Sequence, residues 1–153
     1  MNESERIADQ LHRAFNGKAW HGPSVKEALE GVSAGTALAR PLTAAHSIWE
    51  LVNHLTAWIS EADATVRGKP YESMKGEKDW PPVTEISSEA WEQSLKRMET
   101  AEASLEEALQ ALPPDKLGEG DRSLYYLVNG IAQHNLYHAG QMMLLKKAAA
   151  STG

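Results

Sequence analysis

The sequence predicts an all-α protein, an antiparallel four-helix bundle, from three observations. Four segments repeat apolar residues three to four positions apart, the spacing that puts side chains on one face of a helix. Capping residues and Gly or Pro stops bound these segments. No segment alternates apolar and polar residues as a half-buried strand does, and no internal repeat interrupts the pattern. Amphipathic helices of this length bury their apolar faces most simply against one another.

The N-terminal part of the chain predicts one long and one short helix. Apolar residues recur at helical spacing through residues 3–15, and Asn16-Gly17 follows as a stop signal. A shorter helix is expected between Pro23 and Gly31, where it would act as a connector.

The second long helix has an explicit beginning and end. Ser47 and Glu50 have the spacing of a capping box, in which each side chain accepts a hydrogen bond from the other residue's backbone N–H. Gly68 and Pro70 end the pattern. The helix between them is expected to be about 20 residues long, and its apolar stripe predicts a buried face. The stripe consists of Ile48, Leu51, Val52, Leu55, Ile59, Ala62 and Val66.

The remaining chain predicts an irregular segment and two more helices. Residues 68–87 contain Gly, Pro, Lys and the run Trp80-Pro81-Pro82, too long for a minimal turn, so this segment is expected to cover something. A third helix begins near Ser87 and stops before Pro113-Pro114, and the fourth, residues 122–148, is expected to be the most buried. The third helix carries a glutamate series that we expect to form a solvated face. That series is Glu99, Glu102, Glu106 and Glu107.

Composition restricts the classes of function. With 153 residues the chain is expected to form one domain, residues 1–153. The formal charge of -6 opposes binding to nucleic acids, and the absence of cysteine excludes disulfides and thiolate ligands. The N-terminus lacks the apolar core of a secretory signal, and no run approaches the about 20 apolar residues of a membrane span. We expect a cytoplasmic protein with neither a nucleic-acid nor a membrane partner.

Three histidines predict a metal site. His134 and His138 are four residues apart, in line with Leu127 and Ile131, so both imidazoles are expected to face the core and reach one ion. His54, midway along the second long helix, is the natural third ligand. Three neutral histidines leave a coordination position open, which is the ligand count of catalytic zinc sites.

Other interpretations of these residues are weaker or remain open. The histidines could instead be core residues that hydrogen-bond to backbone or to neighbours without any metal. Asn135 stands where a zincin helix carries its glutamate, which excludes the metalloprotease motif, and no Glu-x-x-His occurs to support a di-iron site. His46 and His21 could approach the site, whereas His12 is expected on the surface. Trp49, Trp58 and Trp91 are interpreted as core or interface anchors.

The histidine motifs resemble the DinB-like superfamily, including metal-dependent hydrolases of the YfiT type. The resemblance implies a four-helix bundle, commonly a homodimer, with a divalent ion such as zinc or nickel on His54, His134 and His138. The matching segments are His46-Ser47-Ile48-Trp49-Glu50-Leu51-Val52-Asn53-His54, His134-Asn135-Leu136-Tyr137-His138-Ala139-Gly140-Gln141 and Trp20-His21-Gly22-Pro23-Ser24.

The resemblance leaves the reaction open. Similar proteins include hydrolases and S-transferases that use small thiol cofactors, so a small-molecule substrate or a thiol is the expected partner. The alternative is a binding protein without catalysis, in which the ion only ties two helices together. An enzyme needs a pocket that opens onto the ion, whereas a structural site is closed. No residue in the sequence is identified as a catalytic base.

Overall fold

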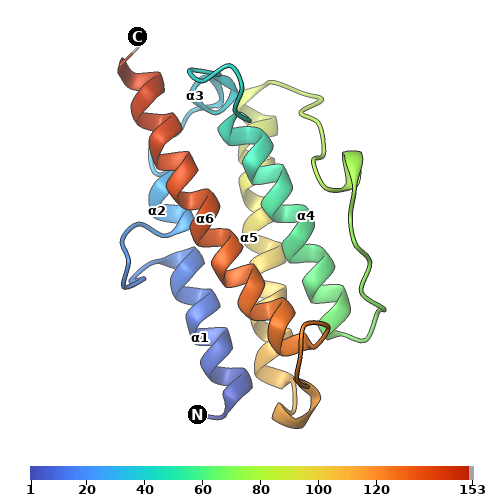
Figure 1. The fold of residues 1–153 in the computed structure, drawn as a ribbon. Helices are drawn as coiled ribbons and strands as arrows, with labels where there is room; N and C mark the ends of the chain where they lie inside the picture. Colours follow the sequence, from blue (N-terminus) through green and yellow to red (C-terminus); the bar gives the residue numbers. More distant parts are fainter. Residues whose placement is uncertain (152–153) are drawn as a thin grey trace.

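The computed structural model describes residues 1–151, and all regular secondary structure in this range is helical, as the sequence predicts (Figure 1). Residues 152 and 153, the end of the expected domain, lie outside the described residues. The α-helices are α1 Glu3–Asn16, α2 Val25–Leu29, α3 Ala34–Leu38, α4 Ile48–Val66, α5 Ser88–Ala111 and α6 Leu124–Ser151, and short 3-10 helices lie at Gly76–Lys78 and Pro114–Lys116.

The helix boundaries follow the capping residues. The predicted capping box of α4 is confirmed: Glu50 N donates to Ser47 Oγ at 3.2 Å and Ser47 N donates to Glu50 Oε2 at 2.8 Å. Two differences from the prediction occur. The helix α3 was not predicted, because five residues carry too little periodicity, although Ser33 caps it. At the other end of the chain, α6 continues to Ser151, beyond the predicted end at residue 148.

The long helices α1, α4, α5 and α6 lie side by side, but neighbouring helices are not antiparallel throughout. Trp49 near the beginning of α4 donates its Nε1–H to Ser94 near the beginning of α5, at 3.0 Å. Asp63 near the end of α4 accepts from Ser104 Oγ, further along α5, at 2.9 Å. These contacts show that α4 and α5 run in the same direction, while α1 and α6 run in the other (Figure 1). For the α4 and α5 pair the expected antiparallel arrangement is therefore wrong.

Residues 67–87, called here the crossover segment, connect these two parallel helices. Parallel neighbours require a connection that returns along their whole length, which explains the length of this stretch. Figure 1 shows the segment running beside α4. Glu61 of α4 binds it at two points, because its carboxylate accepts from Lys69 Nζ at 2.9 Å and from Glu72 N at 3.1 Å.

The core lies between the four long helices. Trp49 and Trp91 are 2% and 1% exposed, with ring centroids 5.1 Å apart, which confirms them as core anchors. Trp58 is only partly buried. Within residues 1–151, no helix is both long and apolar enough to span a membrane. The other large side chains that are less than 2% exposed are Phe15, Leu11, Ile48, Leu51, Leu55, Ile59, Met98, Leu105, Leu109 and Met142.

One residue of the glutamate series is buried, which corrects the prediction of a solvated face. Glu102 is 1% exposed, and Asn135 on α6 is fully buried. Neither side chain makes a well-formed hydrogen bond within the described part of the chain. Burial, and secondarily the charge of Glu106, raises the pKa of Glu102 to about 8, while the nearby Asn135 opposes this rise. Glu102 is therefore a neutral carboxylic acid at pH 7.

Candidate metal centre

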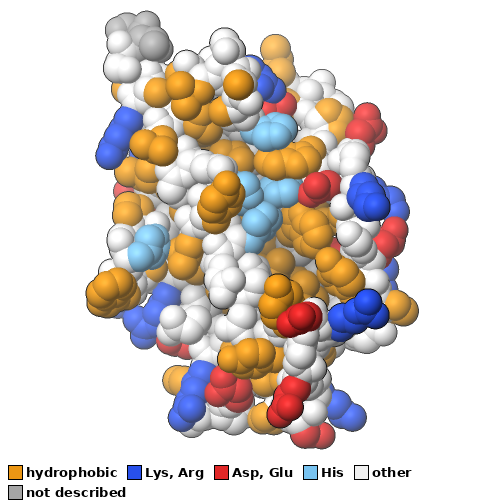
Figure 2. Space-filling model, viewed as in Figure 1, with side chains coloured by type: hydrophobic (Ala, Val, Ile, Leu, Met, Phe, Trp, Pro, Cys, Tyr) orange, Lys and Arg blue, Asp and Glu red, His pale blue; other side chains and the backbone are white. Residues whose placement is uncertain are grey.

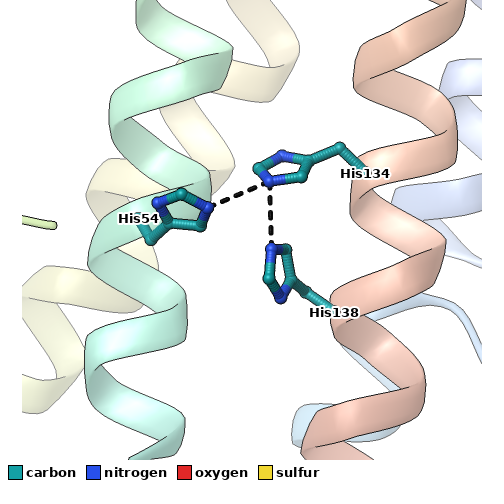
Figure 3. Close-up of side chains that lie close together, drawn as sticks. All are labelled: His54, His134 and His138. Carbon is teal, nitrogen blue, oxygen red and sulfur yellow. Dashed lines mark hydrogen bonds between the residues drawn. The ribbon is translucent and has the colours of Figure 1, made fainter. Parts of the chain in front are cut away.

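Helices α4 and α6 bring His54, His134 and His138 together (Figure 3). His134 Nε2 lies 3.0 Å from His54 Nε2 and 3.0 Å from His138 Nε2. His54 and His138 are each 5% exposed, and His134 is half-buried. The one-turn spacing on α6 aligns two rings, and the capped start of α4 fixes the depth of the third. These three side chains could hold a metal ion.

Hydrogen-bond partners fix the proton positions on two of the rings. The backbone carbonyl oxygen of Asp79 lies 2.7 Å from His54 Nδ1. Because a carbonyl only accepts, Nδ1 carries the proton and Nε2 presents a lone pair. On the other helix, Gln141 Oε1 lies 2.6 Å from His138 Nδ1 and imposes the same tautomer. Such partners on the far nitrogen are typical of metal-binding histidines.

The three converging nitrogens therefore have too few protons for the contacts between them. His54 Nε2 and His138 Nε2 are both acceptors, and each lies 3.0 Å from His134 Nε2. His134 can carry at most one proton on that nitrogen. At least one of the two close contacts consequently joins two lone pairs, which repel each other in a half-buried site. A cation accepts all three lone pairs, so the donor set fits a metal ion.

All three imidazoles are neutral at pH 7. Burial, followed by the charges of His138 and His54, lowers the pKa of His134 to about 4. Burial also lowers the pKa of His54, against the opposing effect of Asp79. The pKa of His138 falls for the same reason, with Gln141 opposing it. Neutral imidazole is the form that binds metals.

The crossover segment covers the cluster with Asp79 and Trp80. Asp79 Oδ1 lies 3.1 Å from His54 Nδ1 and accepts from Trp58 Nε1 at 2.7 Å. The indole of Trp80 stacks on the His54 ring at a centroid distance of 3.8 Å and on the His46 ring at 3.6 Å. The expectation that this segment covers something is confirmed, and what it covers is the histidine cluster.

A pocket of about 880 Å³ opens beside the cluster. It lies between α4, the crossover segment and the beginning of α6, and its lining includes His54 and His134. Figure 2 shows histidine side chains in the centre of this face of the molecule, among hydrophobic side chains. A second hollow of about 600 Å³ between α4 and α5 has no histidine in its lining. Only the first of these two cavities reaches the cluster.

The other histidines have different surroundings. His12 is exposed on α1, as expected, with Nδ1 3.1 Å from a carboxylate oxygen of Glu106. His21 is exposed in the loop before α2. His46 is separated from His54 by the Trp80 ring, and its Nδ1 lies 3.4 Å from Glu50 Oε2. Neither His21 nor His46 belongs to the cluster of converging nitrogens.

Sequence reasoning missed the residues that support the cluster. Asp79 and Trp80 lie in an irregular segment without periodicity, so their position beside His54 has no signal in the sequence. Gln141, three residues after His138 on α6, could have been found, because side chains three apart on a helix are neighbours.

The chain matches the model of a known protein family. The family model described as the DinB superfamily matches residues 20–142, a range that contains all three clustered histidines. Searches of the curated proteins and of the solved structures found no match. Because the match covers most of the sequence, the chain belongs to the DinB superfamily.

Proposed function

We propose that this protein is a metal-dependent hydrolase that holds one divalent ion, zinc or nickel, on the Nε2 atoms of His54, His134 and His138. The observation that carries the proposal is the convergence of three neutral imidazoles with facing lone pairs. Membership of the DinB superfamily supports metal binding. The residues that position the ligands are Asp79 and Gln141, which hold the far nitrogens of His54 and His138.

The pocket favours catalysis over a purely structural ion. Three protein ligands leave at least one coordination position free, and the pocket beside His54 and His134 gives small molecules access to that position. When bound there, a zinc ion supplies a Lewis acid and a water molecule whose pKa is about 7. Asp79 keeps the proton on His54 Nδ1, and the Trp80 ring excludes water from the outer side of His54.

The experiment combines metal analysis with an esterase assay. Protein purified without a histidine tag is expected to contain close to one equivalent of transition metal, and the zinc-loaded form is expected to hydrolyse p-nitrophenyl acetate faster than chelated protein. His134→Ala removes the central nitrogen, so both metal content and chelator-sensitive hydrolysis are expected to fall severalfold or more. His21→Ala, an exposed histidine in a loop, is the matched control and keeps both.

Other outcomes of this experiment decide between the alternatives. Full metal content in His134→Ala would contradict the three-histidine site. A metal-loaded protein that instead accelerates transfer of glutathione or cysteine to an electrophile would identify a thiol S-transferase. Metal binding that only raises the melting temperature, with no reaction in either assay, would indicate a binding protein in which the ion stabilises the fold.

The single domain and the cytoplasmic location remain predictions from the sequence. We also propose that two copies of the chain associate through α6. Tyr137 and Leu144 are each 65% exposed and lie two turns apart on one face of α6. Gly140 lies between them, and apart from its own neighbours along the helix no atom lies within 4 Å of where its side chain would begin. Such an apolar strip on a helix is buried most readily against the same strip of a second copy.

A further inference from the structure

The pocket beside the histidine cluster has an aromatic wall built from three separate segments. Trp58 comes from α4, Tyr71 from the crossover segment and Tyr126 from α6. Tyr71 and Tyr126 are 54% and 60% exposed. Exposed aromatic side chains that gather around one hollow are typical of ligand sites, because their flat faces are free to pack against a flat apolar group.

The same pocket contains an arginine without a partner. Arg122 lines the pocket just before α6, and within residues 1–151 its guanidinium makes no ion pair or hydrogen bond. Every other arginine in this range has one: Arg6 with Glu3, Arg13 with Asp9, Arg40 with Glu50, Arg67 with Asp63 and Arg97 with Ser94. Asp121 also lines the pocket but does not pair with Arg122. A free guanidinium in a pocket is suited to a carboxylate or a phosphate.

The arginine and the histidines lie at opposite ends of the pocket. Leu124, which begins α6, and His134 are ten residues apart, so the helix separates their Cα atoms by about 15 Å. Histidine side chains on a helix lean toward its N-terminus, so the His134 ring lies closer to the beginning of α6 than its Cα atom does.

We propose that the substrate of this site is a flat, largely apolar organic anion, such as an aromatic carboxylate. Its anionic group binds the Arg122 guanidinium, its apolar body packs on the aromatic wall of Trp58, Tyr71 and Tyr126, and its reacting group points toward His54 and His134. The assignment of the reacting end rests on the proposed hydrolase function. The recognition of the anion rests on Arg122 alone.

Isothermal titration calorimetry with three probes tests this assignment. The probes are 3-phenylpropionate, its neutral analogue 3-phenylpropionamide, and propionate, which lacks the ring. Zinc-loaded and chelated proteins are titrated in parallel, so that a carboxylate bound directly by zinc is recognised by its loss on chelation. We expect 3-phenylpropionate to bind about tenfold more tightly than either analogue in both forms, because a charged hydrogen bond and an aromatic contact each contribute about that factor.

Substitutions of Arg122 test whether this residue produces the preference for the carboxylate. Arg122→Gln is expected to reduce the affinity for 3-phenylpropionate to that for the amide and to leave the amide unchanged, while Arg122→Lys keeps part of the preference. Arg6→Gln, an arginine on α1 outside the pocket lining, is the matched control and keeps all of it. A carboxylate preference that survives in Arg122→Gln would overturn the proposal, and so would equal affinity of the wild type for all three probes. Loss of hydrolysis or of zinc binding, with Arg122-dependent anion binding intact, would refute the proposed hydrolase and not this inference.

Discussion

Replacing Glu102 by glutamine is expected to stabilise the protein by an amount that grows with pH. The folded-state pKa of Glu102 is raised to about 8 from its usual 4.5 because the carboxyl group is buried. Above pH 4.5 the unfolded chain loses this proton while the folded protein retains it. The stability contributed by the neutral acid is therefore complete below pH 4.5 and is lost as the pH rises through 8.

The size of this change in stability follows from the shift in the pKa of Glu102. One pKa unit corresponds to about 1.4 kcal/mol, so ionisation of the unfolded state costs about 3 kcal/mol of stability at pH 7 and about 4 kcal/mol at pH 8. Glutamine has nearly the same shape as glutamate and cannot ionise. Relative to wild type, Glu102→Gln should thus gain little at pH 5 and several kcal/mol at pH 8.

Urea unfolding followed by circular dichroism measures this difference at pH 5, 6, 7 and 8. A chelator is present in every sample, because metal binding has its own pH dependence. Titration of the three clustered histidines affects wild type and variant equally and cancels in the difference. Glu107→Gln, which changes an exposed residue on the same helix, is the matched control and is measured at the same four pH values. If the gain from Glu102→Gln stayed constant between pH 5 and 8, the buried neutral acid would be refuted.

Four further predictions concern the metal site and the oligomer. Burial lowers the pKa of His134 to about 4 and also lowers the pKa values of His54 and His138, so zinc should be retained at pH 6 and released near pH 4, as measured by dialysis and elemental analysis. The chelated protein should lose stability as the pH falls below about 6.5, because the histidines of the unfolded chain take up protons first. Asp79→Ala should weaken zinc binding about tenfold in a chelator competition, because His54 keeps only a backbone partner, whereas Asp121→Ala should have no effect. Light scattering should give the mass of a dimer for wild type and of a monomer for the double variant Tyr137→Glu and Leu144→Glu; a monomeric wild type would contradict the α6 interface.

The sequence predicted those features that local chemistry determines. The capping box at Ser47 and Glu50 marks the start of α4 because both partners lie within one turn. The spacing of His134 and His138 put both on one side of α6 for the same reason. The third histidine required a different argument, its position midway along α4, and the structure brings its Nε2 to 3.0 Å from His134 Nε2.

What the sequence did not reveal depends on contacts between distant segments. Periodicity marks a buried face but carries no direction, so the parallel course of α4 and α5 could not be derived from it. Glu102 was assigned to a solvated face because it lies in a run of glutamates. It also lies in line with Met98 and Leu105, four and three residues away, and that spacing was a sign of its burial.

The crossover segment exists because two parallel helices must be joined from end to end. Mutations in this segment are therefore expected to have different effects from mutations in the bundle. The bundle carries the histidines and the core, so changes there alter stability. The crossover carries Asp79, Trp80 and Tyr71, which touch the site without filling the core. It is held to the bundle by hydrogen bonds to Glu61, Asn53 and His54, and by Trp80 and Val83, which pack against the edge of the core. Substitutions along this segment can therefore change what the pocket accepts while the folded bundle stays intact, which makes it the natural place to redirect specificity by directed evolution.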